Sequence, residues 1–320
     1  MKVGKLPSDL LDKLLGVVPM TDSRVLLGPA VGEDAAVVDM GNNRVLLAKT
    51  DPITFATDEI GWYSVHINAN DIAVTGGTPR WYLATLLVPE GSEERVVEEI
   101  FEQIVSACNT LDISLIGGHT EVTYGLDRVM VVGAMLGEAS KQDIISTSGS
   151  RLGDRIILTK GIAIEGSAVL AREASDKLSH LGVARDSIER AKDYLYKPGI
   201  SVVEEANKVR AVATIHSMHD PTEGGLATGL QEIAKAANIG MCVEKELIPI
   251  LPECQEICNV LRLDPLGLLA SGCLVLTTLP AHVPSVVKAL EELGVEAHDI
   301  GEITKAGDGI KLISQSSVED

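Results

Sequence analysis

The strongest constraint on the fold is the alternation of short apolar segments with longer helical segments along the first half of the chain. Residues 44–48 follow turn residues at 41–43, which is typical of a strand. Residues 60–74 have a helical pattern that ends at the Gly-Gly pair 76–77. Strands are also expected at residues 81–88, 114–116 and 129–136, and a long helix is expected at residues 92–110 with Ser92 as its N-cap.

The second half repeats this alternation after a polar segment at residues 138–154. A chain of 320 residues with a hydrophobic fraction of 45% is long enough for two cores. We therefore expect an α+β protein with domains at residues 1–150 and 151–320. The second half predicts strands at residues 156–159, 212–216 and 273–277, and helices at residues 167–174, 225–237 and 283–293.

Charge and cysteine usage restrict the partners and the compartment. The chain has 46 acidic and 27 basic residues, a formal net charge of -19, which disfavours nucleic acid and anionic membrane surfaces as partners. No secretory signal and no run of about 18 apolar residues is present, so we expect a cytoplasmic protein. Of the five cysteines, Cys254 and Cys258 lie one helical turn apart, but reduced packing cysteines are a better interpretation than a metal site.

Acidic and amide residues gather beside glycines and at the ends of apolar segments. Both G-x-x-x-x-G-K-[ST] and G-x-G-x-x-G are absent, so the standard phosphate loops are excluded. Because Mg²⁺ bridges carboxylates to phosphates, Asp34, Asp51 and Asp71 are candidate metal ligands. Each alone is better explained as a cap or turn residue, but several clusters in one chain favour a shared site. The clusters are residues 32–36, 49–51, 68–71, 117–121 and 220–225.

Glycines in two of these clusters allow the backbone to approach a ligand. Gly224 and Gly225 precede an expected helix, whose first N–H groups can face an anion. Gly117 and Gly118 allow a similar approach. A tight turn explains either pair equally well.

Other candidate residues are weaker. His216 and His219 are three residues apart near the end of a strand, so their side chains should point in different directions. Ser167 is better explained as a helix N-cap than as a nucleophile. His119 is a candidate for polarising a substrate oxygen, although a lone histidine is more often structural.

The order of these clusters resembles the PurM-like superfamily of aminoimidazole ribonucleotide synthetase, thiamine-monophosphate kinase, selenophosphate synthetase and HypE, with HypE the most similar. The resemblance covers nearly the whole chain. It rests on residues 32–36 (the family's G-[DE]-D-A-A), 50–51 (T-D), 65–79 (V-N-x-x-D-[IL]-A-x-x-G), 117–120 (G-G-[DE]-T), 218–227 (R-D-P-T-R-G-G-L-A) and 263–266 (L-D-P-L).

The resemblance implies an N-terminal sheet domain that forms a homodimer and the ATP site, and a C-terminal α/β sandwich domain. ATP and Mg²⁺ are the implied cofactors. The implied catalytic residues are Asp71, Asp220 and His119, and the implied metal ligands are Asp34, Asp51, Asp71 and Glu121. The implied nucleotide-binding residues are Asp34, Lys49, Asp51, Asn68, Asn70, Gly117, Gly118, Thr120, Thr222, Gly224 and Gly225.

Family members use ATP to phosphorylate a substrate, most of them at an amide-like oxygen. We therefore expect a HypE-like ATP-dependent enzyme that acts on an unidentified small molecule or on a group carried by another protein. A kinase of the thiamine-monophosphate type is one alternative. A non-catalytic nucleotide-binding dimer that partners maturation proteins is the other.

Three departures from the HypE pattern bear on that reaction. HypE ends in Pro-Arg-Ile-Cys, whereas the last cysteine here is Cys273. The acidic residue of the G-G-[DE]-T segment is His119 here, and Glu121 is a substitute ligand. Where HypE has Asn-Glu-Gly, residues 270–272 are Ala-Ser-Gly, which removes a carboxylate expected to act as an acid or a base.

Overall fold

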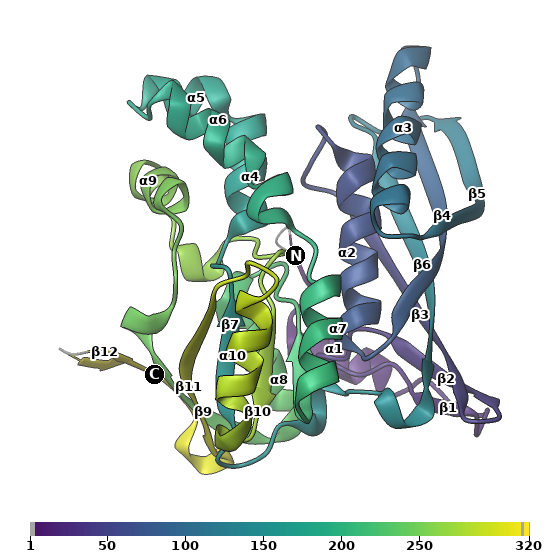
Figure 1. Ribbon diagram of the computed structural model, residues 1–320. Helices are drawn as coiled ribbons and strands as arrows, with labels where there is room; N and C mark the ends of the chain where they lie inside the picture. The colour runs from purple at the N-terminus through teal and green to yellow at the C-terminus, as the bar shows by residue number, and fades with distance from the viewer. Residues whose placement is uncertain (1–3, 315–316, 320) are drawn as a thin grey trace.

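The computed structural model describes residues 4–314 and 317–319, which form two domains that lie side by side (Figure 1). The N-terminal domain has a six-stranded sheet in the order β1-β2-β3-β6-β4-β5. Neighbouring strands are antiparallel except β4 and β5, which are parallel. The strands are β1 (Val25–Leu27), β2 (Ala36–Gly41), β3 (Arg44–Ile53), β4 (Thr78–Pro89), β5 (Ser114–Thr123) and β6 (Met130–Ser140).

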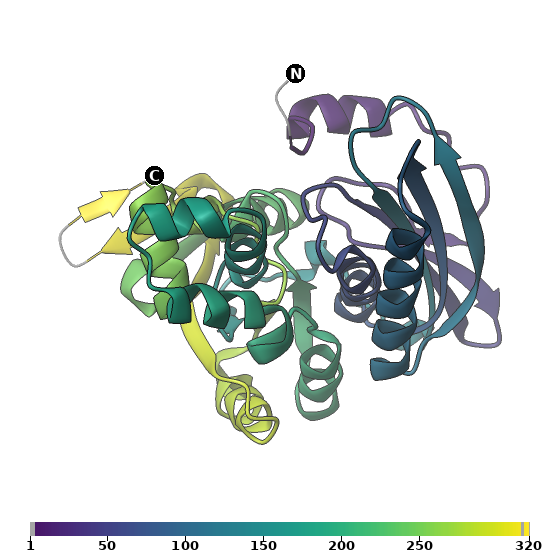
Figure 2. The same cartoon turned by 90° about the horizontal axis from the view of Figure 1, so that it is seen from above.

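Helix α2 (Ile60–Val74) lies between the N-terminal sheet and the C-terminal domain, and α3 (Glu94–Thr110) packs beside it (Figure 2). All residues of α2 except Trp62 are buried, which is expected for a helix covered on every side. Glycines let α2 sit close to β6, because a Cβ on Gly133 or Gly137 would overlap the side chains of Asn68 and Ile72. The other face of the sheet points away from the molecule (Figure 2).

The C-terminal domain has a seven-stranded sheet in the order β13-β12-β9-β11-β7-β10-β8, in which only β12 and β9 form a parallel pair among the described strands. The strands are β7 (Arg155–Thr159), β8 (Ile215–His219), β9 (Ile239–Glu244), β10 (Val275–Thr278), β11 (Ala297–Lys305), β12 (Ile310–Ser314) and β13 (Ser317–Glu319).

The remaining α-helices are α1 (Ser8–Leu15), α4 (Ile164–Glu173), α5 (Ser175–His180), α6 (Arg185–Asp193), α7 (Val203–Val212), α8 (Gly225–Ala237), α9 (Pro252–Leu261) and α10 (Val283–Glu291). No helix within residues 4–314 and 317–319 is long and apolar enough to cross a membrane.

The Asn70 side chain of α2 forms hydrogen bonds between the two domains. Asn70 is fully buried, its amide donates to the carbonyl of Ile200 at 2.8 Å, and its oxygen accepts from the N–H of Val202 at 2.9 Å. Because all these groups are buried, the hydrogen bonds fix how α2 sits against the start of α7. These bonds use one N–H and one lone pair of the Asn70 amide, and its nucleotide-binding role stays a prediction.

Several predicted elements are confirmed. The helices at residues 60–74 and 225–237 have the predicted bounds, and the strand predicted at residues 44–48 continues to Ile53. The sheet changes between β6 and β7, which fits the polar segment at residues 138–154, while the boundary after residue 150 stays a prediction.

Both predicted serine caps are wrong. The helix expected from Ser92 begins at Glu94, and the Ser92 hydroxyl donates to the carbonyl of Pro89 at 2.9 Å. Ser167 lies inside α4, where its hydroxyl donates to the carbonyl of Ala163 at 2.7 Å. Serine can bond to a carbonyl three or four residues back as well as to an N–H ahead, so its position alone does not decide where a helix begins.

Candidate nucleotide and metal site

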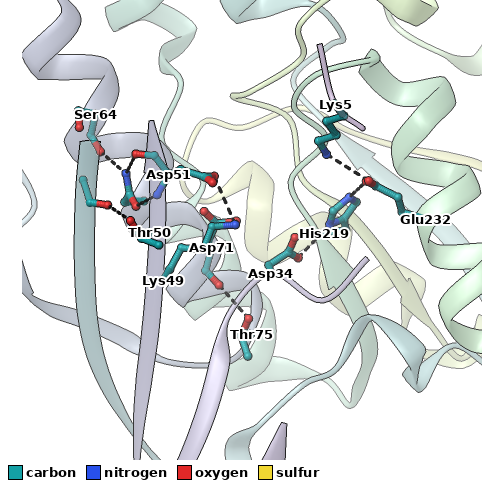
Figure 3. A network of polar contacts seen from close by, with 12 residues as sticks. Lys5, Asp34, Lys49, Thr50, Asp51, Ser64, Asp71, Thr75, His219 and Glu232 are labelled. Atoms are coloured by element: carbon teal, nitrogen blue, oxygen red, sulfur yellow. Dashed lines mark hydrogen bonds and ion pairs between the residues drawn. The ribbon is translucent and has the colours of Figure 1, made fainter. Parts of the chain in front are cut away.

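Four carboxylates from both domains meet beside the end of β8. Asp51 lies in β3 and Asp71 lies in α2, and Lys49 joins them with Nζ at 3.3 Å from a carboxylate oxygen of each (Figure 3). Asp34 precedes β2 and Asp220 follows β8, and both act electrostatically on Lys49. Residues up to 186 positions apart in the sequence therefore form one acidic cluster, as the sequence predicts.

Lys49 is the cation of this cluster. Burial opposes its charge, but the carboxylates of Asp71, Asp51 and Asp34 outweigh burial and raise the pKa of Lys49. The ammonium therefore stays charged at every physiological pH. A buried cation beside an open carboxylate cluster is well placed to contact a phosphate.

A chain of ion pairs runs from Asp34 into the C-terminal domain (Figure 3). His219 lies between two carboxylates, with Nδ1 at 2.9 Å from Asp34 and Nε2 at 3.0 Å from Glu232, and Glu232 also binds Lys5 at 3.1 Å. Burial works against a charged imidazole, but the two carboxylates raise the pKa of His219 well above its usual value. Burial also opposes the charge on Glu232, yet His219 and Lys5 lower its pKa to about 2.

His219 is therefore a doubly donating imidazolium rather than a metal ligand. One nitrogen or oxygen atom from each of Asp34, His219 and Asp220 lies within 4.8 Å of the other two, which is a ligand-like spacing. However, a ring whose two nitrogens both face carboxylates has no lone pair to offer. His216 binds Asp154 at 2.8 Å instead, so the two histidines point to different carboxylates, as the strand period predicts.

The carboxylates fit a hard divalent cation. Both oxygens of Asp220 and Oδ2 of Asp71 are buried and make no hydrogen bond to the described residues. Burial, with a further contribution from Asp34, raises the pKa of Asp220 to about 8, and burial also raises the pKa of Asp71 well above its usual value. Unpaired buried carboxylates are costly unless they are neutralised by a proton or a metal ion. Mg²⁺ would neutralise the carboxylate charge and bind the free carboxylate oxygens, because it takes oxygen ligands.

Space for a ligand adjoins the cluster. A cavity of about 270 Å³ is bordered by Asp34, Lys49 and His219. A larger cavity of about 650 Å³ lies on the other side of α2, but its buried Lys160 is already paired with Glu205 at 2.6 Å and with two backbone carbonyls. The smaller cavity is therefore the better phosphate site, because Lys49 borders it and also contacts Asp51 and Asp71 of the carboxylate cluster.

Asn68 positions Asp51. Its oxygen accepts from the N–H of Asp51 at 2.9 Å, and its amide donates to the carbonyls of Ser64 at 2.8 Å and Asp51 at 3.3 Å. The nucleotide-binding role of Asn68 stays a prediction. The residue still belongs to the site, because it holds the strand that carries Asp51.

Two family models cover most of the chain. The N-terminal domain model of AIR synthase related protein matches residues 32–139, and the C-terminal domain model matches residues 151–313. The chain belongs to the AIR synthase-related family. This two-domain α+β fold is therefore PurM-like, as the resemblance implies.

Similar proteins and a similar solved structure support this family assignment. The chain is 29% identical over 315 residues to a putative hydrogenase expression/formation protein of Methanocaldococcus jannaschii, which covers 96% of this chain and 90% of the relative. It is 29% identical over 285 residues to carbamoyl dehydratase HypE of Cupriavidus necator, which covers 86% and 78% of the two chains. A structure of the hydrogenase maturation protein HypE in complex with ATP superposes with a TM-score of 0.73 at 22% identity, covering 95% of this chain and 88% of that chain.

The family's G-G-[DE]-T segment does not join the carboxylates within one chain. Residues 117–121 lie on the edge strand β5, where the side chains of His119 and Glu121 are 65% and 49% exposed and bind each other at 3.0 Å. In the sheet, His119 is aligned with Thr85 of β4, then Val132 of β6 and then Pro52 of β3. Three strand spacings separate it from the Asp51 region, or about 14 Å. The predicted grouping of Glu121 with Asp34, Asp51 and Asp71 is therefore not formed by a single chain.

The same distance applies to Gly117, Gly118 and Thr120, which also lie on β5. Gly118 is required by packing, because a Cβ there would overlap the carbonyl of Ala84 in β4. The contact of these three residues with a nucleotide stays a prediction.

Gly224 and Gly225, in the loop before α8, are also required by packing within the chain. A Cβ on Gly225 would overlap the carbonyl of Leu266, and a Cβ on Gly224 would overlap Thr228. Both residues still lie at the start of α8, a few residues after Asp220. Their contact with a nucleotide stays a prediction, as does that of Thr222.

The sequence did not predict the roles of His219, Glu232, Lys5 and Glu165. His219 directly precedes Asp220 in the sequence. Its role depends on an ion pair with Asp34, which is 185 positions away and cannot be predicted from local sequence. Glu165 is buried near the site with one carboxyl oxygen that makes no hydrogen bond to the described residues. In the sequence Glu165 precedes Gly166 and Ser167, a pattern that suggests a role only for the serine.

Proposed function

We propose that this chain is a HypE-like ATP-dependent enzyme that transfers the γ-phosphoryl group of Mg²⁺-ATP to an amide-like acceptor. The observation that carries the proposal is the buried carboxylate cluster, in which three oxygens of Asp71 and Asp220 make no hydrogen bond to the described residues. Asp34, Asp51, Asp71 and Asp220 would hold Mg²⁺, which supplies the positive charge that lets an acidic site accept a triphosphate. Lys49 contributes a fixed cation to the transferred phosphate.

The relatives support this assignment. HypE of Cupriavidus necator is a carbamoyl dehydratase, and a HypE structure contains ATP. The alignment with the Cupriavidus necator protein covers 86% of this chain. A cytoplasmic location remains a prediction that agrees with this function.

The acceptor group comes from another molecule in this proposal. Cys273 is fully buried, its thiol contacts the carbonyl of Ala270 at 3.3 Å, and burial raises its pKa to about 12. It cannot act as an exposed carrier thiol. Cys108, Cys254 and Cys258 are also buried, and burial raises the pKa of the less buried Cys242. An amide on a small molecule or on a partner protein is therefore the acceptor.

A homodimer would complete the site. The outer face of the N-terminal sheet carries half-buried Leu83, Leu87 and Val132. His119 and Glu121 lie on the same face, because they are aligned with Thr85 and Leu87 of β4. A partner packed on this apolar face would cover it and bring a second copy of the His119–Glu121 pair toward the cluster. Sedimentation velocity tests this directly: the wild type should be a dimer, Leu87→Lys should be a monomer, and a monomeric wild type contradicts the proposal.

Calorimetric titration of ATP, with and without Mg²⁺, tests the nucleotide site. Binding should require Mg²⁺, and a wild-type protein that binds no ATP in its presence would refute the proposed function. Tight Mg²⁺-ATP binding without ADP release toward any amide would instead favour the non-catalytic alternative. Conversion of thiamine monophosphate to the diphosphate would identify the kinase alternative.

A further inference from the structure

A buried carboxyl group at the start of α4 faces a narrow cavity next to the cluster. Glu165 is 7% exposed, and neither its Oε2 nor the neighbouring Ser271 hydroxyl makes a hydrogen bond to the described residues. The cavity, of about 20 Å³, is also lined by Asp51, Thr222 and Glu223. That volume holds about one water molecule or the end of one small polar group. The lining therefore contains polar atoms with unused bonding capacity.

Main-chain hydrogen bonds fix the backbone that carries this carboxyl group. The N–H of Glu165 donates to the carbonyl of Ser271 at 3.3 Å, and the N–H of Gly166 donates to the carbonyl of Leu269 at 2.9 Å. The N–H of Ala270 in turn donates to the carbonyl of Thr222 at 3.3 Å. Glu165 is thus held at a set position relative to the loop that follows Asp220. A side chain held in this way is pre-organised for a reaction partner.

The charges around the cavity select its occupant. Burial raises the pKa of Glu165 to about 7, and the charge of Glu223 raises it further. The other titratable groups that face it are Asp51 from β3 and Tyr63 from α2, and no cation lines the cavity among the described residues. A carboxylate or phosphate would be repelled there. A neutral group with N–H donors would satisfy the unpaired oxygens.

We propose that Glu165 is a catalytic acid/base residue and that the cavity receives the N–H end of the acceptor amide, an inference that rests on the proposed function. Glu165 stands beside Ser271, the position where the HypE pattern has the glutamate of Asn-Glu-Gly. The carboxylate lost from that segment is therefore supplied by α4. In the transfer step, the amide oxygen forms a bond to the γ-phosphorus, and the bond between that phosphorus and the bridging oxygen of ADP breaks. Glu165 takes the proton that the amide nitrogen loses.

Kinetics of Glu165→Gln and Glu165→Ala test this role, with formamide as the acceptor probe and Glu291→Gln, an exposed helix residue, as the matched control. We expect Glu165→Gln to lower kcat for ADP release by roughly 10²-fold or more, because a general base contributes on the order of 10² to 10⁴. The Kd for Mg²⁺-ATP should change by less than about twofold, since Glu165 does not line the cavity that Asp34 and Lys49 border. Formate should restore ADP release in Glu165→Ala only. Unchanged kcat in Glu165→Gln, or no formate rescue in a folded Glu165→Ala, overturns the inference.

A second measurement separates this inference from the proposed function. The ¹³C carboxyl resonance of Glu165 should shift when formamide is added to the wild type, and the Glu291 resonance should not. Failure of the wild type to bind Mg²⁺-ATP refutes the nucleotide function, whereas normal Mg²⁺-ATP binding without a formamide-dependent shift refutes the role of Glu165. The shift is measured whether or not formamide supports turnover, so contact between probe and carboxyl is decided in every case.

Discussion

The carboxylate cluster and the edge strand β5 both carry family motifs, yet the chain treats them in opposite ways. The cluster combines residues from the two domains around Lys49 and buries Asp71 and Asp220. On β5, His119 and Glu121 are exposed and contact each other. Family motifs therefore indicate residues with a common function, but the fold decides which of these residues lie close together within one chain. His119 and Glu121 can join the nucleotide site only if a second molecule brings them near the carboxylate cluster.

Mg²⁺-ATP affinity should differ most between a variant in the carboxylate cluster, Asp71→Asn, and a variant on β5, His119→Ala. The amide is a neutral and weaker metal ligand, so we expect Mg²⁺-ATP affinity to fall by roughly 100-fold, or about 2.7 kcal/mol. His119→Ala should leave the Kd of a monomeric Leu87→Lys protein unchanged, because one chain does not join the two regions. Calorimetry measures both. Equal losses in the two variants would show that the regions are coupled within one chain.

Asn70→Ala should separate a structural residue from the ligands beside it. The substitution leaves the carbonyl of Ile200 and the N–H of Val202 buried without partners, at a cost of roughly 1–3 kcal/mol each. Urea unfolding should show this loss relative to Asn109→Ala, an exposed helix residue. Normal stability of Asn70→Ala would contradict the proposed tie between the domains.

The metal-free cluster should make stability depend on pH. The pKa of Asp220 is raised from its unfolded value of 3.8 to about 8, so the folded state holds the extra proton between these values. Stability is then lost as pH rises toward 8, and His219, whose pKa is also raised, acts in the same direction above about 6.5. We expect the Tm without metal to fall by several degrees between pH 5 and pH 8, and Mg²⁺ to reduce the fall. A flat profile that Mg²⁺ does not change would contradict the metal assignment.

Ser92→Ala should give the smallest effect. Loss of a true N-cap costs about 1 kcal/mol, whereas Ser92 bonds only to the carbonyl of Pro89, so we expect a loss below about 0.5 kcal/mol. Thermal unfolding beside Ser285→Ala, whose hydroxyl also bonds to a carbonyl three residues back, provides the comparison. A loss near 1 kcal/mol would restore the cap predicted from sequence.

Local signals in the sequence were sufficient for some parts of the fold and the site. The Gly-Gly pair after residue 74 predicts where α2 ends, and the carboxylates of Asp34, Asp51 and Asp71 converge as expected. The roles of Asn68 and Asn70 were not predictable, because each depends on which backbone groups α2 meets after folding. Glu165 was missed because its burial comes from a loop more than 100 residues away.

The buried helix α2 carries several unrelated tasks on successive residues. Asn68 orients a strand, Asn70 joins the domains and Asp71 faces the cluster. One residue inserted before this segment would rotate everything after it by about 100°. The helix therefore tolerates changes of side chain far better than any change of length, and homologues should keep its residue count fixed even where their loops differ.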